Sequence, residues 1–275
     1  MDTSVAIELI PGLAAEDRAA LRQYLADPFR LSDAEWQRVR SAIDLLARST
    51  IVFSERRYIF QQFYAVFING TYARPYLRQL AETEAPERDG PQFQAETARK
   101  ILAWLRLNGL TPSAIPGAEY LTIYCLYRWA SFGRGYLFER IVIQDLRAAG
   151  IRLVAHAPEY GRERYTASDL SITGIGAGDV KSSLYFLDDL ADPRSDFYIT
   201  RLYDAEGRAV RQVVLMTPQG WQQVDGKPQS ASIARAAHHF PLPVLVEAVG
   251  RSWVVVEYTA WKDRILRWQS RRRSK

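Results

Sequence analysis

The chain changes character near Ser131. Before this point, apolar residues recur at the three- and four-residue spacing of amphipathic helices, as over 14–25 and 32–48. After it, short apolar runs separated by glycine-containing turns are typical of strands. We therefore predict an α+β or α/β protein, with a helical domain over 1–130 and a mixed β-sheet core flanked by helices over 131–275.

The helical half carries clear start signals. Ser32 followed by Glu35 is the capping-box pattern that begins a helix. Ser54 predicts the start of another helix running to about Ile68, which is dense in aromatic residues between arginines. Such a stretch suits base stacking beside phosphates, or a bulky core with a charged outer face, and the core is favoured. The polar stretch 82–93 predicts a linker or exposed loop.

Charge and cysteine content exclude several classes of protein. The 36 Lys and Arg residues against 31 Asp and Glu leave a net charge of +5. The last nine residues hold five cations and no acid, so the rest of the chain is neutral and the terminus is expected to be a basic tail. A single cysteine, Cys125, excludes a disulfide framework, and we expect it to be buried in the core.

The chain carries no signal for a membrane. It has no basic-then-apolar leader and no run of about 18 apolar residues, so we expect no membrane association and a cytoplasmic location. Arginine supplies 31 of the 36 cations and lysine only five. A lysine in a chemically suggestive position is therefore less often an arbitrary positive charge in this chain.

The second half predicts one helix followed by a series of strands. A glycine-rich entry precedes a helix over about 135–149, which Gly150 closes as a C-cap. The glycine run 174–178 predicts the turn of a hairpin. The strand signals fall at residues 151–157, 165–173, 179–187, 197–203, 211–217 and 252–261, the last just before the basic tail.

Four polar residues of this half form a pattern that carries chemistry. Glu139 lies at the edge of the apolar arc of its helix, where a carboxylate is costly unless it is paired, hydrogen-bonded or bound to a metal. Asp145 also lies within this arc. Asp179 and Lys181 project to the same side of their strand. The register of the hairpin decides whether Asp169 meets them, and a bulged or splayed turn would let the two carboxylates converge. Two acids can hold a hard divalent cation, and a lysine can orient water beside a phosphodiester.

These residues resemble the core of the PD-(D/E)XK, or restriction-endonuclease-like, nuclease superfamily, in the order helix, strand, strand, strand. The resemblance implies that Asp169 and Asp179 are metal ligands assisted by the Val180 carbonyl. It also implies that Lys181 is the catalytic lysine and that Glu139 tunes or binds the metal.

The resemblance covers about residues 133–190. The segment 135–151 is similar to the opening of Holliday-junction-resolvase-like members. Ser168 stands where the family name has proline, and Asp179 replaces the commoner Glu. The implied fold is a restriction-endonuclease-like mixed sheet in 131–275.

The function expected from the resemblance is that of a metal-dependent DNA endonuclease using Mg²⁺ or Mn²⁺, of restriction, recombination, mobile-element or defence type. DNA is the expected partner, and the helical domain would position it or recruit a protein. The residues expected to contact nucleic acid are Ser182, Ser183, Arg271, Arg272 and Arg273.

Two alternatives from other classes remain open. The first is a catalytically inactive nucleic-acid-binding or scaffold subunit of a larger complex with the same fold. The second is a helical interaction protein in which the acid-Lys pattern is accidental. His156 and the pair His238–His239 lack the spaced third ligand of a metal site, although His156 lies on the strand expected beside Asp169.

Overall fold

The computed structural model describes residues 5–10, 12–82, 86–156, 168–182, 195–203, 209–222, 229–230, 243–248 and 250–271. The chain divides into two compact units, Met1–Arg134 and Gly135–Lys275. The division predicted from the sequence lies four residues earlier. Helices and a mixed sheet make the protein α+β.

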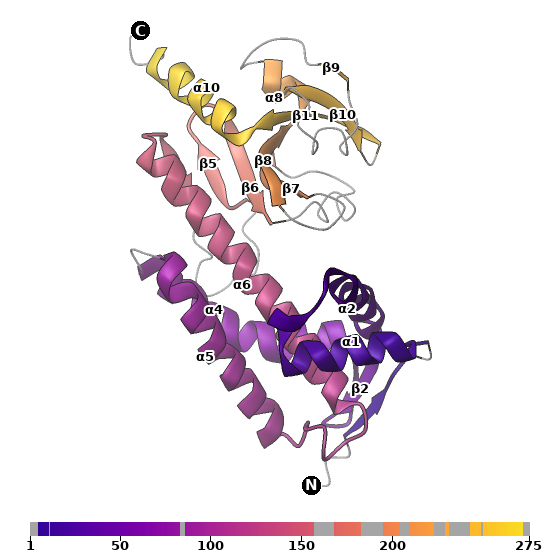
Figure 1. The fold of residues 1–275 in the computed structure, drawn as a ribbon. Coiled ribbons are helices and arrows are strands. Elements are labelled where there is room, and N and C mark those ends of the chain that lie inside the picture. The colour runs from indigo at the N-terminus through magenta and orange to yellow at the C-terminus, as the bar shows by residue number, and fades with distance from the viewer. Residues whose placement is uncertain are drawn as a thin grey trace. The chain divides into compact units, whose positions relative to one another are not determined.

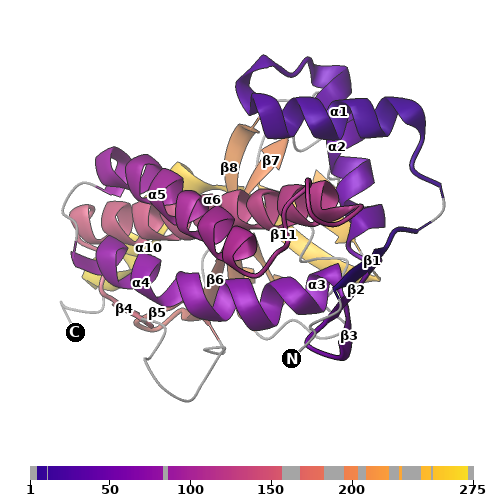
Figure 2. The ribbon, with the colours of Figure 1, turned by 90° about the horizontal axis from the view of Figure 1, so that it is seen from below.

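The first unit is mainly helical and carries a small sheet (Figures 1 and 2). Ser32 accepts from the Glu35 N–H and donates its own N–H to the Glu35 carboxylate, which confirms the capping box of α2. The elements of this unit are β1 (Ala6–Glu8), α1 (Ala15–Ala26), η1 (Pro28–Arg30), α2 (Asp33–Leu46), β2 (Thr50–Phe53), β3 (Arg56–Ile59), α3 (Phe60–Phe63), the π-helical η2 (Tyr64–Asn69), α4 (Gly70–Glu82), α5 (Pro86–Leu107) and the first part of α6 (Ala118–Ala148).

The helix predicted from Ser54 is wrong in its first turns. Strands β2 and β3 form an antiparallel hairpin, and Ser54 and Glu55 are its two turn residues, with φ of 49° and 63°. Helix begins only at Phe60. The two positive φ values describe a turn that the sequence does not signal, because Asn-Gly or Asp-Gly is the usual pair there.

Two segments that the sequence predicts to interrupt helices are themselves helical. Helix α5 begins at Pro86, so most of the predicted linker 82–93 lies in helix. Helix α6 runs without interruption through the predicted glycine-rich entry. A Cβ on Gly133 would lie 2.9 Å from the Gln94 side chain. The glycine therefore allows close approach of α5 rather than ending a helix.

The aromatic residues of the first unit form its core, as favoured from the sequence. Phe60 and Phe63 are fully buried. Phe63 and Phe67 pack with ring centroids 4.8 Å apart, and each lies about 6 Å from Trp104 of α5. Phe53 of β2 also packs on Phe63, so these rings join the hairpin to α3, η2 and α5.

The second unit is built on an eight-stranded mixed sheet in the order β4-β5-β6-β7-β8-β11-β10-β9 (Figure 1). Strands β4, β5 and β6 are successive antiparallel neighbours, and β7 then pairs parallel to β6. Its elements after α6 are β4 (Leu153–Ala155), β5 (Leu170–Ile172), β6 (Gly176–Lys181), β7 (Phe197–Tyr203), β8 (Ala209–Met216), α8 (Pro218–Gln222), β9 (Gln229–Ser230), β10 (Val244–Ala248), β11 (Arg251–Glu257) and α10 (Tyr258–Arg271).

One face of this sheet forms the core with helices α6 and α10. Alternate residues of the central strands bury against Phe138 and Val142 of α6 and against Trp261 and Ile265 of α10. Because strand side chains alternate, the neighbours of these core residues project from the opposite face. Val180 lies on the core face, so Asp179 and Lys181 project from the other.

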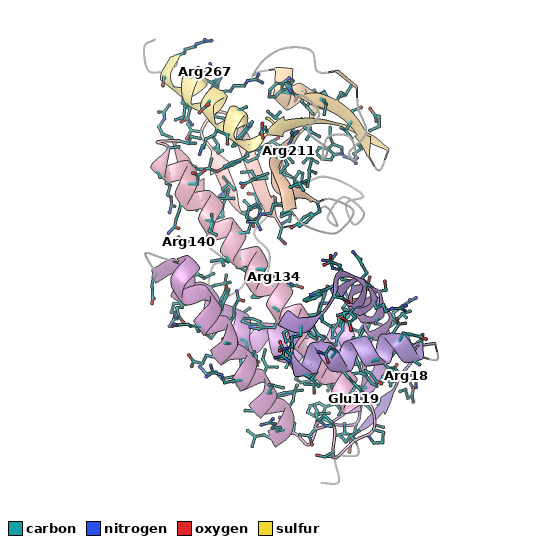
Figure 3. The ribbon with its side chains drawn as sticks, viewed as in Figure 1. Arg18, Glu119, Arg134, Arg140, Arg211 and Arg267 are labelled. Atoms are coloured by element: carbon teal, nitrogen blue, oxygen red, sulfur yellow. The ribbon has the colours of Figure 1, made fainter. Side chains whose placement is uncertain are left out.

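The C-terminal segment differs from the prediction. Residues from Tyr258 to Arg271 form helix α10, whereas a strand to Trp261 and a basic tail were expected. The helix has a buried side that contains Trp261, and Arg267 extends from it into solvent (Figure 3). Arg267 and Arg271 lie on the exposed face of α10, opposite the buried side, and Arg271 is the last residue of the helix that the structure describes.

Helix α10 is held on the β5–β6 hairpin by Trp268 and Gln269. Gln269 accepts from the Arg152 N–H and donates to the Arg152 and Thr173 carbonyls. Gly174 has φ of +81°, and a Cβ there would lie 2.0 Å from the Trp268 ring. Glycine is therefore needed at this turn both for its backbone and for this close approach.

Candidate active site

The candidate site lies where β6 loses its pairing with β5. Strand β5 pairs with β6 from Gly176 to Gly178, whereas β7 pairs with β6 from Gly178 to Lys181. Among the described strands, the segment after Gly178 is therefore paired on one side only. A half-paired strand end exposes backbone groups that need other partners.

Asp169 fills this position with both its backbone and its side chain. Its N–H donates to the Gly178 carbonyl at 3.0 Å, and its Oδ2 accepts from the Val180 N–H at 2.7 Å. The carboxylate thus replaces the next rung of the ladder. The same contact fixes the direction in which the acid points.

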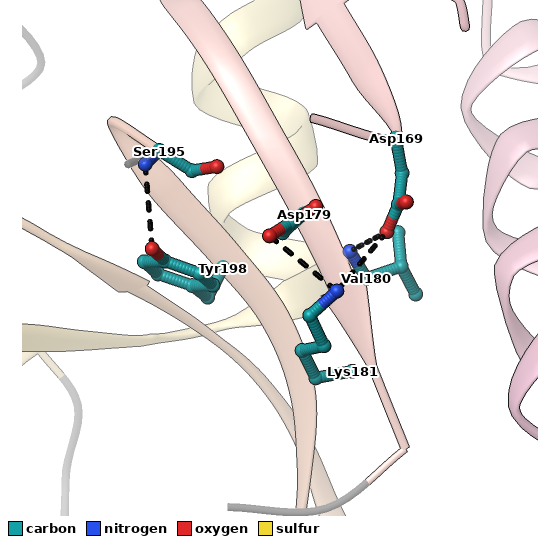
Figure 4. A network of polar contacts seen from close by, with 6 residues as sticks. All are labelled: Asp169, Asp179, Val180, Lys181, Ser195 and Tyr198. Atoms are coloured by element: carbon teal, nitrogen blue, oxygen red, sulfur yellow. Dashed lines mark hydrogen bonds and ion pairs between the residues drawn. The ribbon is translucent and has the colours of Figure 1, made fainter. Parts of the chain in front are cut away.

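Lys181 joins the two aspartates into one cluster (Figure 4). Its Nζ lies 3.4 Å from Oδ2 of Asp179 and 3.7 Å from Oδ2 of Asp169. The Asp169 and Asp179 side chains are 19% and 17% exposed, and that of Lys181 is 36% exposed. The splayed hairpin considered from the sequence is therefore present, and the three side chains meet at its fork.

The cluster carries more negative charge than one lysine balances. Burial raises the pKa of Asp169 to about 6, with Lys181 opposing the rise and Asp179 adding to it. Burial alone would lower the pKa of Lys181, but the two aspartates raise it by more, so the ammonium stays charged. A cation added to this site would be stabilised by both acids.

Glu139 of α6 lies within electrostatic reach of the same cluster. Burial, followed by the charge of Asp169, raises its pKa to about 8, although Lys181 lowers it. Glu139 therefore holds a proton at neutral pH in the absence of another cation. Helix α6 passes close to the end of β6, because a Cβ on Gly135 would lie 3.9 Å from the Ser182 Oγ.

Two neighbouring aspartates are the side chains that could bind a metal ion at the fork, and a larger cluster of ligands is not present among the described residues. Among the described residues, no three or more His, Cys, Asp or Glu side chains are grouped closely enough to hold a metal ion. Asp169 and Asp179 are the two carboxylates that share Lys181. Mg²⁺ is commonly bound by one or two carboxylates together with waters and substrate phosphates.

The remaining predicted residues are only partly placed at the site. Val180 has its side chain in the core, and its N–H binds Asp169. Ser182 follows β6, and its carbonyl accepts from the Tyr203 hydroxyl. Arg271 ends α10, and the ion pairs of the two aspartates within the described residues are with Lys181 rather than with Arg271. Ser183, Arg272 and Arg273 lie outside the described residues, as do His238 and His239.

Strand β7 adds polar residues that sequence reasoning missed. Tyr198 and Thr200 lie opposite Asp179 and Lys181 in the parallel register. The Tyr198 hydroxyl accepts from the Ser195 N–H at 3.3 Å (Figure 4). The hydroxyls of Ser195 and Thr200 are buried and have no hydrogen-bond partner among the described residues. Side chains alternate between the two faces of a strand, and this alternation along the predicted strand 197–203 could have placed residues 198 and 200 on one face.

Asp145, the second acid in the arc of α6, has a structural role. It accepts from the Tyr258 hydroxyl at 2.7 Å and from Lys262 Nζ at 2.8 Å, both on α10. Lys262 and the Tyr258 hydroxyl lower its pKa against the effect of burial. Cys125 is fully buried, and burial raises the pKa of its thiol.

Comparisons with known proteins give no relatives. No protein-family model, no curated protein and no solved structure matches the chain. Among the described helices, none combines the length and apolar character needed to cross a bilayer.

Proposed function

We propose that the chain is a metal-dependent DNA endonuclease that hydrolyses phosphodiester bonds at the fork between β5 and β6. The observation that supports this most directly is the position of Lys181 Nζ, within 4 Å of both Asp169 and Asp179. The three groups come from two strands whose pairing ends at this point. Ion pairs that only stabilise a surface do not require such a break in the sheet.

The donor set fits a hard divalent cation. Asp169 and Asp179 would hold Mg²⁺ or Mn²⁺ through oxygen, with the remaining positions left to water and to the phosphate. The raised pKa values of Asp169 and Glu139 indicate uncompensated negative charge that such an ion would offset. When bound, the ion would polarise the phosphate and lower the pKa of the attacking water.

The protein side chains would then have distinct tasks. Lys181 is charged and would donate a hydrogen bond to the attacking water or to a phosphate oxygen as charge accumulates there. The water oxygen forms the new bond to phosphorus, and one ester bond breaks to leave an alcohol. Glu139 would act from α6 as a proton acceptor or tuning acid, losing its own proton when positive charge enters the site.

The order of elements supports the resemblance to PD-(D/E)XK nucleases. Helix α6 carries Glu139 and is followed by the antiparallel strands β4, β5 and β6. Strand β6 carries Asp179 and Lys181, and Asp169 directly precedes β5. A restriction-endonuclease-like fold for the second unit is part of this proposal.

Phosphate contacts away from the cleaved bond would come from the exposed face of α10. Arg267 and Arg271 are four residues apart on this face, and they are therefore neighbours on the helix surface. Such cations bind DNA without reading its sequence, and the affinity falls steeply with salt.

The test is a nicking assay on supercoiled plasmid and on single-stranded DNA with Mg²⁺ or Mn²⁺ and a chelator control. The variants are Asp179→Asn and Lys181→Ala. Lys100→Ala is the matched lysine control, because Lys100 is an exposed residue of the first unit paired with Glu96. We expect metal-dependent cleavage by wild type and Lys100→Ala, and a loss of at least 100-fold in the other two.

Three other outcomes of the nicking assay would contradict the proposal, and each favours a different interpretation. Metal-dependent cleavage that survives in Lys181→Ala would assign the activity to other residues. Salt-sensitive DNA binding without cleavage would favour the inactive binding subunit. The absence of both would favour the helical interaction protein.

A further inference from the structure

A histidine and a serine form a polar pair beside the fork. His156 Nε2 and Ser171 Oγ lie 2.8 Å apart, from the segment after β4 and from β5. The His156 N–H also donates to the Asp169 carbonyl at 2.9 Å. The pair is therefore joined directly to the backbone of a candidate catalytic residue.

The register places this pair on the same sheet face as the aspartates. Ser171 and Asp169 are two residues apart, so both project from the face opposite the core residue Leu170. Ser171 lies opposite Ala177 on β6, which is two residues before Asp179. Along the strand direction, the His156–Ser171 pair therefore lies two residues, or about 7 Å, from Asp169 and Asp179.

The surface around the pair is built from small or exposed side chains. Val154 lies opposite Ser171 on β4 and is 62% exposed, and Ala177 is partly exposed on the other side. Edge strand β4 pairs only with β5 among the described strands. A polymer can therefore approach this face while its reacting group lies at Lys181.

The pair retains one hydrogen-bond donor in either neutral tautomer of His156. If Nε2 carries the proton, it donates to Ser171 Oγ and the serine O–H remains available. If Nδ1 carries the proton, the serine O–H donates to Nε2 and the Nδ1–H remains available. No other side-chain partner of either residue is present among the described residues.

We propose that the His156–Ser171 pair binds the phosphate next to the one that is cleaved, as a positioning site for a nucleic-acid strand running across β5. This inference depends on the proposed function, because the neighbouring phosphate is defined by cleavage at the fork. A donor one nucleotide away from the acids sets where the strand lies. It contributes to binding rather than to the chemical step.

The test combines side-chain changes with neutral phosphates in the substrate. Oligonucleotides cut at one preferred bond would carry a single methylphosphonate, placed in turn at each phosphate flanking that bond. The variants are Ser171→Ala and His156→Phe, with Ser171→Thr as the conservative rescue. Val154→Ala is the control for a change on the same face that leaves the donor pair intact.

We expect one flanking methylphosphonate to raise the KM of wild type about tenfold with little change in kcat. The same substitution should have no further effect in Ser171→Ala or His156→Phe, which already have the raised KM on the natural substrate. Ser171→Thr and Val154→Ala should behave as wild type. A merely structural role would lower activity on all substrates alike, without this coupling.

The two proposals fail in different ways. Cleavage with no position at which methylphosphonate and variant effects coincide would overturn the phosphate site and leave the nuclease intact. Fluorescence anisotropy of the same oligonucleotides with Ca²⁺ supplies a readout without cleavage. Coupling between a methylphosphonate and a variant in this binding measurement would support the phosphate site independently of the cleavage rate. If no oligonucleotide is cut, the nuclease and the phosphate site defined by cleavage are both rejected.

Discussion

The Asp169 carboxylate accepts a 2.7 Å hydrogen bond from the Val180 N–H and, through the same oxygen, lies 3.7 Å from the Lys181 ammonium. One side chain therefore closes the end of the sheet and contributes charge to the candidate site. A substitution that keeps the shape of the Asp169 side chain and one that removes the side chain should distinguish its structural role from its role in the candidate site.

We predict that Asp169→Asn retains most of the stability, because its amide oxygen can still accept from Val180. Asp169→Ala leaves that N–H without its partner and should lower the free energy of unfolding by about 1–2 kcal/mol. Both variants should lose cleavage under the proposed function. Urea unfolding and the nicking assay measure the two effects, and equal destabilisation by both variants would contradict the capping role.

A second prediction concerns the pH dependence of stability through Glu139. Its pKa is raised from 4.5 to about 8, so the folded protein holds this proton more tightly than the unfolded chain does. Its contribution to stability is complete below about pH 4.5 and is lost as the pH rises toward 8. We expect Glu139→Gln to be more stable than wild type at pH 8 by about 1–3 kcal/mol.

The same experiment has an internal control. Glu16→Gln, the same substitution at an exposed residue of α1, is the matched control for the change of side chain. Addition of Mg²⁺ should stabilise wild type more at pH 8 than at pH 5, and Asp179→Asn should reduce this effect. An identical profile in wild type and Glu139→Gln would show that Glu139 is not the titrating group.

A third prediction concerns the close approach of Gly174 to Trp268. Gly174→Ala places a Cβ 2.0 Å from the ring and forces an L residue to φ of +81°, so we expect a loss of about 2–4 kcal/mol. Gly150→Ala separates the two causes, because its φ is +83° and nothing lies within 4 Å. It should cost about 1 kcal/mol.

A double variant tests the steric part directly. In a Trp268→Ala background, Gly174→Ala should cost no more than Gly150→Ala does. Full additivity of the two changes would indicate that ring and glycine do not interact. Thermal unfolding of the four proteins gives the coupling free energy.

The sequence predicted features that depend on near neighbours. Ser32 and Glu35 are three residues apart, and their capping box is confirmed. Asp179 and Lys181 share a strand face by alternation alone, and their side chains lie 3.4 Å apart. In both cases the regular geometry of the helix or strand brings the two side chains together, so the contact can be predicted without knowledge of the tertiary packing.

Features that depend on distant residues were not predictable in the same way. Asp145 has the same sequence pattern as Glu139, and its partners Tyr258 and Lys262 lie more than 100 residues later in the chain. Gly133 lies inside the uninterrupted α6 and packs against Gln94 of α5, a contact that the local sequence does not signal. The basic terminus also gave no sign that Trp261 would bury one side of a helix.

The pairing of Asp145 with α10 gives a fourth prediction. Asp145→Ala removes the acceptor of both Tyr258 and Lys262 and should lower the free energy of unfolding by about 1–2 kcal/mol. Cleavage under conditions where the variant is folded should be unchanged, because no contact joins Asp145 to Lys181 among the described residues. A loss of kcat comparable to that of Lys181→Ala would move Asp145 into the active site.

The fifth prediction concerns the turn of the β2–β3 hairpin, where two ordinary residues adopt positive φ. Ser54 and Glu55 have φ of 49° and 63°, the conformation that Asn-Gly adopts at least cost. Both side chains are exposed, and neither makes a side-chain contact within the described part of the chain that the change would remove. Replacing the pair by Asn-Gly should raise the free energy of unfolding by about 0.5–1 kcal/mol. Urea unfolding measures this gain, and Ala-Ala at the same positions, which keeps a Cβ on both residues, should give no such gain.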